Sequence, residues 1–328
     1  MPRIPAAPRC SKSRKATLVD RRRAADNRVV SVGDLPQPEP PPEYQRGRGP
    51  VSLARRWRRG GAAITRGIAA AARDDGAAAE RAFLQADEDG VAEGSFNLGL
   101  FYGKHGDADR AIAPYRRAAE RGYMRADWYL GFLLRGRADP TGAEEAFRRG
   151  AEAGEEHCAL ELSRMLEARG DDDGALRAAL RAEELGHEEG SLAAGLLLQR
   201  RGAMAEAREA LTRGAARGHG NSAVQLGKLL QRAGEETAAL RAFARANEIG
   251  SPDGAFLYGY LLARHGKSQA AGAALIRADT LGSADAALLL GKQHEEAGNT
   301  RAAVDTYRRA AERGNDDAAN ALRRLQGN

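Results

Sequence analysis

Apolar, small and polar positions return along this chain with a fixed 32-residue period. In one interval, Ser95–Gly106 and Asp107–Gly122 are each typical of a helix, and Gly106 stands in the turn between them. Gly106 recurs as Gly170, Gly202, Gly234, Gly266 and Gly298. A second series closes each repeat at Gly90, Gly122, Gly154, Gly186, Gly218, Gly250, Gly282 and Gly314. The pattern predicts one helix pair in each interval.

Recurring residues inside the helices predict how the pair packs. Leu98 returns as Leu130, Leu162, Leu226 and Leu290, and a glycine follows each of them except Leu162, which Ser163 follows. A glycine inside a helix costs about 1 kcal/mol relative to alanine. Its repetition indicates close approach by the second helix, whose Ala111 and Tyr115 return as Ala143/Phe147, Ala239/Phe243 and Ala303/Tyr307. We therefore expect the aromatic ring to lie across the glycine.

The octet YRRAAERG shows that the pattern is a repeat array. It occurs at Tyr115–Gly122 and again at Tyr307–Gly314, which is six such intervals further along the chain. Fixed periods of this length are typical of stacked helical repeats. The composition agrees, because the hydrophobic residues amount to 42% and are mainly Ala and Leu, whereas aromatic residues amount to 5%. Such usage favours helices packed through small side chains over a large sheet.

The array resembles the tetratricopeptide repeat (TPR) family. Leu98-Gly99-x-x-Tyr102 and Ala111-x-x-x-Tyr115 match that family's motif, and the resemblance covers residues 60–328. The family's tryptophan is replaced by a small residue at Ser95, Ala159, Ser191, Ala223, Ala255 and Ala287, and AAERG replaces the closing proline turn. Both departures look like Sel1-like repeats, although the longer loop between Sel1 helices is missing. The resemblance implies an all-α, right-handed superhelical solenoid of antiparallel helix pairs that binds partners in a concave groove.

The repeats also predict the domain boundaries. Nine of the twelve prolines lie in the first fifty residues, so residues 1–49 are expected to be a disordered basic tail. Residues 50–328 are the repeat domain, opened by a short basic helix, VSLARRWRRG. This domain comprises a degenerate first repeat (58–89), seven repeats (90–313) and a capping half repeat (314–328), in which Arg323 occupies the glycine position. The Ala-, Arg- and Gly-rich usage is typical of a high-GC, bacterial genome.

Charge is distributed unevenly between the tail and the array. Residues 1–60 contain fifteen Lys/Arg and five Asp/Glu, a net charge of +10. The remaining residues contain thirty-six Lys/Arg and forty Asp/Glu, a net charge of −4. Basic runs bind polyanions through counterion release, so tethering to nucleic acid or to an anionic membrane is the alternative function. No apolar run reaches the length of a membrane span, and no signal peptide is evident. A cytoplasmic protein is expected.

Residues capable of chemistry do not form a known catalytic or ligand motif. Cys158 occupies a small-residue position of the repeat, and Cys10 lies in the tail, so no disulfide or metal is expected. His105 and His265 share one repeat position, and neither HExxH nor GxSxG occurs. The GKS within His265–Gln269 lacks the first glycine of a phosphate loop. We expect no catalysis and no cofactor.

The first helix of each repeat therefore carries the functional hypothesis. One position there is always apolar, as Phe96 and its equivalents, which indicates packing between neighbouring repeats. The position four residues later varies, and arginines recur at a further position. These side chains suggest a groove for an extended or helical peptide, with acidic groups on the peptide matching the basic ones in the groove. The candidate groove residues are Trp128, Phe132, Arg164, Arg200, Lys228, Arg232, Tyr260, Arg264 and Lys292.

Overall fold

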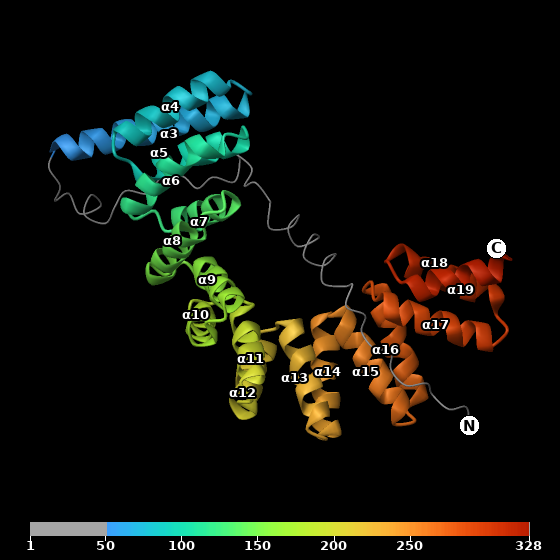
Figure 1. Ribbon diagram of the computed structural model, residues 1–328. Helices are drawn as coiled ribbons and strands as arrows, with labels where there is room; N and C mark the ends of the chain where they lie inside the picture. The colour runs from blue at the N-terminus through green and yellow to red at the C-terminus, as the bar shows by residue number, and fades with distance from the viewer. Residues whose placement is uncertain (1–50, 328) are drawn as a thin grey trace. The chain divides into compact units, whose positions relative to one another are not determined.

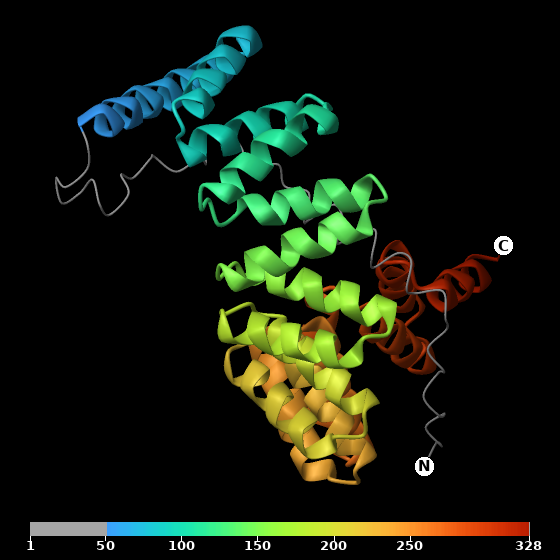
Figure 2. The ribbon, with the colours of Figure 1, turned by 60° about the vertical axis from the view of Figure 1, so that its left-hand side comes forward.

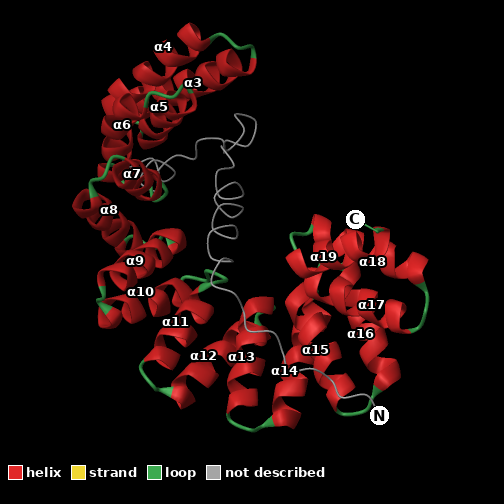
Figure 3. Cartoon of the chain, turned by 45° about the vertical axis from the view of Figure 1, so that its right-hand side comes forward, coloured by secondary structure: helices red, strands yellow, loops and turns green. Residues whose placement is uncertain are grey.

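The structure is a computed structural model and describes residues 51–327, which form seventeen α-helices, α3 to α19 (Figure 1). Short turns join the helices, and no strand occurs in this range (Figure 3). The predicted all-α repeat solenoid is confirmed for the described residues. The tail, residues 1–49, for which the sequence predicts disorder, lies outside them.

Two kinds of helix alternate along the chain. The first helix of each repeat, called the A helix, is α3 (Val51–Ala72), α5 (Ala92–Lys104), α7 (Ala126–Gly136), α9 (Glu156–Arg169), α11 (Gly190–Arg200), α13 (Gly220–Arg232), α15 (Pro252–Arg264), α17 (Ala284–Glu296) or α19 (Asp316–Gln326). The second, called the B helix, is α4 (Gly76–Glu88), α6 (Ala108–Glu120), α8 (Pro140–Glu152), α10 (Asp172–Glu184), α12 (Met204–Ala216), α14 (Glu236–Ile249), α16 (Ser268–Thr280) or α18 (Thr300–Glu312).

The helices form two compact units that divide inside α8, at Ala143 and Glu144. We call residues 51–143 the N-terminal unit and residues 144–327 the C-terminal unit. In each, an A helix packs against the B helix of its own repeat and against the B helix before it, as α5 packs against α6 and α4 (Figure 2). The cores consist mainly of alanine, leucine and aromatic side chains.

Side-chain caps and turn glycines set the helix ends. Asp107 and Asp171 accept hydrogen bonds from backbone N–H groups of the first turns of α6 and α10, and Ser251 caps α15 ahead of Pro252. The glycines between A and B helices have φ of 73–85°, and those that close the repeats have φ of 81–98°. Glycine adopts this left-handed backbone without a steric penalty, so both glycine series are confirmed as turns.

The same left-handed turn forms in two repeats that lack the glycine. Asp74 stands one repeat before Gly106 and Ala138 one repeat after it, and they are the only non-glycine residues with positive φ in the described chain, at 61° and 58°. An L-residue pays a steric penalty there. The packing of the neighbouring helices therefore imposes the turn even where the sequence opposes it.

The glycines within the A helices lie against B-helix side chains. A Cβ built on Gly99 would come 2.8 Å from the Tyr115 ring, and one on Gly291 would come 2.6 Å from the Tyr307 ring. The exception, Ser163, donates a hydrogen bond from Oγ to the Ala175 carbonyl oxygen at 2.8 Å. Its repeat carries a small residue, Ala179, where the others carry an aromatic ring or leucine. The predicted pairing of A-helix and B-helix positions is confirmed. Within each of these repeats, the size of the A-helix residue complements the size of the B-helix side chain that faces it.

The first helix differs from expectation. The basic stretch after Pro50 is the beginning of α3, a continuous helix of 22 residues, and is not a separate short helix. The degenerate repeat is nevertheless in register, because a Cβ on Gly67 would come 2.5 Å from the Phe83 ring. At the other end, α19 packs Leu322 and Leu325 against the core around Tyr307, and no B helix follows within the described residues.

Candidate functional site

Two of the candidate residues lie on α7 in the N-terminal unit. Trp128 and Phe132, four residues apart, are partly exposed, and their ring centroids are 4.9 Å apart in an edge-to-face arrangement. The Arg135 guanidinium lies 4.4 Å from the Phe132 ring centroid, within the range of a cation–π contact. The α7 face is therefore an aromatic patch bordered by a cation.

Three of the candidate arginines in the C-terminal unit are held by carboxylates of the same chain. Arg164 forms ion pairs with Glu161 and Glu189. Arg200 binds Glu167 and Asp172 in the same way, and Arg264 lies 3.4 Å from a Glu236 oxygen. Of the arginines that recur at one repeat position (Arg200, Arg232 and Arg264), two are therefore paired with carboxylates of the chain itself.

The remaining candidates in the C-terminal unit differ from those arginines in their charge environment. Lys228, Arg232 and Lys292 form no ion pair with any residue in 51–327, and the Tyr260 ring lies 6.3 Å from the Phe256 ring. Lys228 and Arg232 are four residues apart on α13, where like charges repel by a few tenths of a kcal/mol. Asn221 and Gln225 continue the same helix face. The α13 face therefore presents hydrogen-bond donors along three turns and no carboxylate.

At Phe96, Leu160 and Val224 the uniformly apolar position is buried and packs between repeats, whereas Trp128 at the same position is partly exposed. Phe96 is 3% exposed and contacts Tyr123 at 4.4 Å and Tyr129 at 5.2 Å between ring centroids, in the loop and A helix of the next repeat. Leu160 and Val224, its equivalents in the C-terminal unit, are also 3% exposed. These side chains stabilise the stack and are not available to a ligand.

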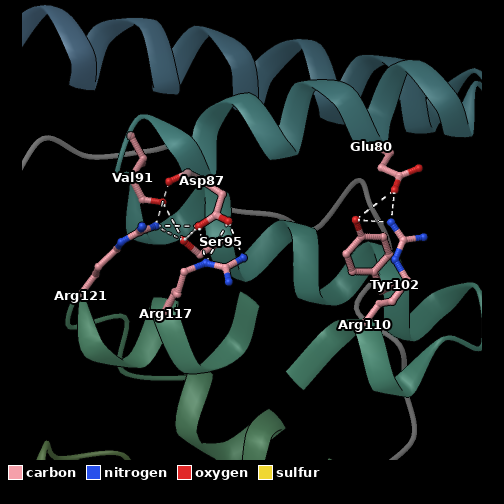
Figure 4. Close-up of polar contacts among 8 residues, drawn as sticks. All are labelled: Glu80, Asp87, Val91, Ser95, Tyr102, Arg110, Arg117 and Arg121. Carbon is pink, nitrogen blue, oxygen red and sulfur yellow. Dashed lines mark hydrogen bonds and ion pairs between the residues drawn. The ribbon is translucent and has the colours of Figure 1, made fainter. Parts of the chain in front are cut away.

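The structure also contains a recurring polar contact that the sequence analysis misses. In the N-terminal unit, Arg117 and Arg121 converge on the Asp87 carboxylate, with nitrogen–oxygen distances of 2.6 and 2.7 Å, and the Ser95 hydroxyl donates to the same carboxylate at 2.6 Å (Figure 4). Asp87 belongs to α4, Arg117 lies in the last turn of α6, and Arg121 is the C-cap residue of α6. The contact therefore joins the B helices of two successive repeats, and we call it a clamp.

The clamp returns at every third repeat. Glu183 receives Arg213 at 2.7 Å and Arg217 at 3.5 Å, and three repeats later Asp279 receives Arg309 at 2.7 Å and Arg313 at 2.5 Å. The sequence separations are 30 and 34 residues each time. Both copies of YRRAAERG supply such an arginine pair, so the clamp is a further reason for the octet's recurrence. A search for acidic residues at these two separations before the repeated arginines would have found it.

The clamp carboxylates are kept ionised by their partners. Burial opposes ionisation of Asp87, but the hydrogen bonds from Arg117, Ser95 and Arg121 outweigh it and lower the pKa of Asp87. For Asp279, burial is again outweighed by Arg309 and Arg313, and the pKa falls. At the equivalent position before three of the other repeated arginines, an alanine (Ala119, Ala151 or Ala215) replaces the acid. Two of these arginines pair within their own helix, Arg181 with Glu184 and Arg245 with Glu248.

A smaller contact in the N-terminal unit also joins an arginine to a carboxylate of the preceding repeat. Tyr102 donates a hydrogen bond from its hydroxyl to Glu80 at 2.9 Å, and Arg110 approaches the same carboxylate at 2.5 Å (Figure 4). The Arg110 guanidinium also lies 4.1 Å from the Tyr102 ring centroid. The tyrosine of the Leu-Gly-x-x-Tyr motif therefore links α4, α5 and α6.

Two histidines that the sequence separates by thirty residues meet in the structure. His187 Nε2 and His157 Nδ1 are 3.1 Å apart, and the Glu189 N–H donates to His187 Nδ1. His187 therefore accepts at Nδ1, and its Nε2 lies within hydrogen-bond distance of His157 Nδ1. Within the described range, no group of three or more His, Cys, Asp or Glu residues has the geometry of a metal site.

The helices also lack the features of a membrane span. No helix between residues 51 and 327 combines the length and hydrophobicity needed to cross a bilayer.

Comparisons with known proteins agree with this architecture. No family model matches the chain, and no curated protein matches it. Among solved structures, a Sel1 repeat protein from Oxalobacter formigenes is similar, with 22% identity, coverage of 89% of this chain and 97% of that one, and a TM-score of 0.65.

Two further solved structures are similar. A protective antigen of uropathogenic Escherichia coli strains, displaying an SLR fold, has 21% identity, a TM-score of 0.57 and coverage of 86% of this chain; the chain spans only 66% of that protein's length. Yeast Tom70 has 12% identity, coverage of 96% of this chain and 75% of that one, and a TM-score of 0.50. The chain therefore has the fold of the TPR and Sel1-like repeat proteins.

Proposed function

We propose that this chain is a non-enzymatic protein-interaction scaffold that binds an acidic peptide segment of a partner along the exposed face of its A helices. The observation that carries the proposal is the α13 face, where Lys228 and Arg232 lack the carboxylate partners that Arg164, Arg200 and Arg264 have. A like-charged pair retained on one helix face without compensation is suited to an anionic ligand.

The neighbouring side chains support a peptide ligand over a simple anion. Asn221 and Gln225 offer amide groups that can pair with a peptide backbone, and they lie on the same face as the two cations. Tyr260 on α15 adds a partly exposed ring, and Lys292 on α17 adds another unpaired cation. Together these residues offer amide, aromatic and charged contacts over successive A helices, as an extended acidic peptide requires.

Charge reversal on α13 tests the proposal. Affinity capture with the intact chain, followed by anisotropy measurements on an acidic peptide from the captured protein, should show at least tenfold weaker binding for Lys228→Glu/Arg232→Glu. The matched control is Arg177→Glu/Arg241→Glu, which makes the same charge change at exposed positions of the B helices α10 and α14. Equal loss in both double variants would indicate a general charge effect and would count against a site on α13.

A further inference from the structure

Three buried polar atoms on α5 lack any hydrogen-bond partner. They are Oε1 of Glu93 and both amide atoms, Oδ1 and Nδ2, of Asn97. Asn97 is 2% exposed, and the two residues are four positions apart, so they share one face of the helix. An unsatisfied buried polar group destabilises the folded state, so three on one face of one helix need a physical reason.

The surroundings of Glu93 contain no compensating cation. Glu93 forms no ion pair within residues 51–327, whereas the buried carboxylates of Asp87, Asp89 and Glu183 are all held by arginines. Glu93 lies in the first turn of α5, where the helix dipole favours a negative charge. Burial nevertheless raises its pKa to about 7. The site is therefore acidic, partly desolvated and without a counterion.

Aromatic side chains border this face. Tyr123, whose pKa is raised to about 12 by burial and by the charge of Glu93, stacks on Phe96 with ring centroids 4.4 Å apart. Tyr129 meets the same phenylalanine edge-on at 5.2 Å. Glu93 and Tyr123 are both partly exposed, so solvent reaches part of each side chain. A carboxylate beside aromatic rings is suited to a cation, because both attract it.

We propose that the α5 face formed by Glu93 and Asn97 binds a lysine or arginine side chain of an extended partner segment. The cation would pair with Glu93 and lie against Tyr123, and a backbone peptide group of the same segment would pair with both amide atoms of Asn97. Because Asn97 is 2% exposed, its amide reaches such a segment only when the side chain turns outward on binding. Charge complementarity selects a basic segment here, in contrast to the acidic one that α13 favours.

Fixed-position peptide libraries test this site on the full chain. Randomised dodecapeptides with a central lysine are compared with dodecapeptides carrying norleucine, which has a similar shape and no charge. The lysine library should be enriched, and the selected peptide should bind Glu93→Gln and Asn97→Leu at least tenfold more weakly. Glu120→Gln, which alters an exposed carboxylate at the end of α6, should bind as the parent does. Equal enrichment of both libraries, or full binding by Glu93→Gln, would overturn the proposal.

Two further measurements identify the occupant and the mechanism. Binding to the parent should strengthen about tenfold between pH 6 and pH 8, as Glu93 ionises, and should stay constant over that range for Glu93→Gln. A synthetic peptide of residues 1–50 serves as competitor; if it displaces the probe from the parent, the occupant is the chain's own basic segment and the partner assignment is wrong. Lys228→Glu/Arg232→Glu should leave this binding intact, so failure of the α13 site and failure of this one are distinguishable.

Discussion

Gly227 lies directly under the ring of Phe243, and a Cβ built on the glycine would come 2.6 Å from the ring's Cδ1 atom. The two residues belong to the A and B helices of one repeat, α13 and α14. Phe243 is 1% exposed and belongs to a core cluster with Leu226 and Leu261. The glycine is therefore a packing residue: the absence of a side chain makes room for the Phe243 ring, although glycine lowers the stability of the isolated helix.

Gly227→Leu should lower the free energy of unfolding. The new side chain displaces the Phe243 ring, an overpacking cost of about 1–3 kcal/mol, whereas leucine's better helix propensity returns nearly 1 kcal/mol. We expect the packing cost to dominate, and urea denaturation of the purified variant measures the difference.

Arg323→Leu is the matched control, because Arg323 holds the same repeat position in α19, where no B helix follows in the described chain. Its stability should stay within about 0.5 kcal/mol of the parent. A Gly227→Leu protein as stable as the parent would show that the ring does not need the glycine.

Ala138→Gly should stabilise the chain. Ala138 adopts φ of 58° at the turn where most other repeats place glycine. A left-handed backbone costs an L-residue about 1–2 kcal/mol, and glycine removes this cost. Part of the resulting gain in stability is offset by the greater conformational freedom of glycine in the unfolded chain. We expect a net gain of about 0.5–1 kcal/mol in thermal or urea denaturation. Gly106→Ala, the reverse change at an equivalent turn, should lose stability; equal stabilities would indicate an unstrained turn at Ala138.

Asp279→Asn should destabilise the C-terminal unit by about 1–3 kcal/mol at pH 7, because Arg309 and Arg313 lose their shared carboxylate. The pKa of Asp279 is lowered from 3.8, so its contribution is fully present above that value and disappears as the pH falls through the lower, folded pKa. The difference between parent and variant should therefore shrink in acid, as denaturation at several pH values would show.

Asp305→Asn provides the control for the clamp. Asp305 pairs with Arg308 at 3.0 Å on the exposed side of α18, where an ion pair contributes between zero and about 1 kcal/mol. A loss in Asp305→Asn as large as that in Asp279→Asn would mean that burial of the clamp adds nothing.

Glu93→Gln should change the pH dependence of stability. The pKa of Glu93 is raised to about 7, so its protonated form favours the folded state below the ordinary value of 4.5, and that contribution is lost as the pH rises through 7. The variant should be more stable than the parent at pH 8 by roughly 1–2 kcal/mol, a figure reduced to allow for the partial exposure of the side chain. Parallel stability curves for both proteins between pH 5 and pH 8 would contradict the assignment.

The sequence by itself determined the features that depend on residues within one repeat. The 32-residue period, the turn glycines, the helix caps and the contact between each A-helix glycine and its B-helix side chain all follow from short-range spacing. Such features repeat because the same local geometry must be built many times. The repeat that lacks the A-helix glycine follows the same size relationship, because Ser163 is accompanied by Ala179 where other repeats pair glycine with a larger side chain.

Only the tertiary structure decided how charged and polar side chains pair across repeats. Arg200 and Arg232 occupy equivalent positions, yet only Arg200 has carboxylates within reach, 28 and 33 residues away. Long side chains select partners by distance and burial, and these depend on how neighbouring helices stack and on which acids their non-repeating positions carry. For the same reason the Asp87 clamp and the unpartnered Asn97 became visible only when successive helices were placed side by side.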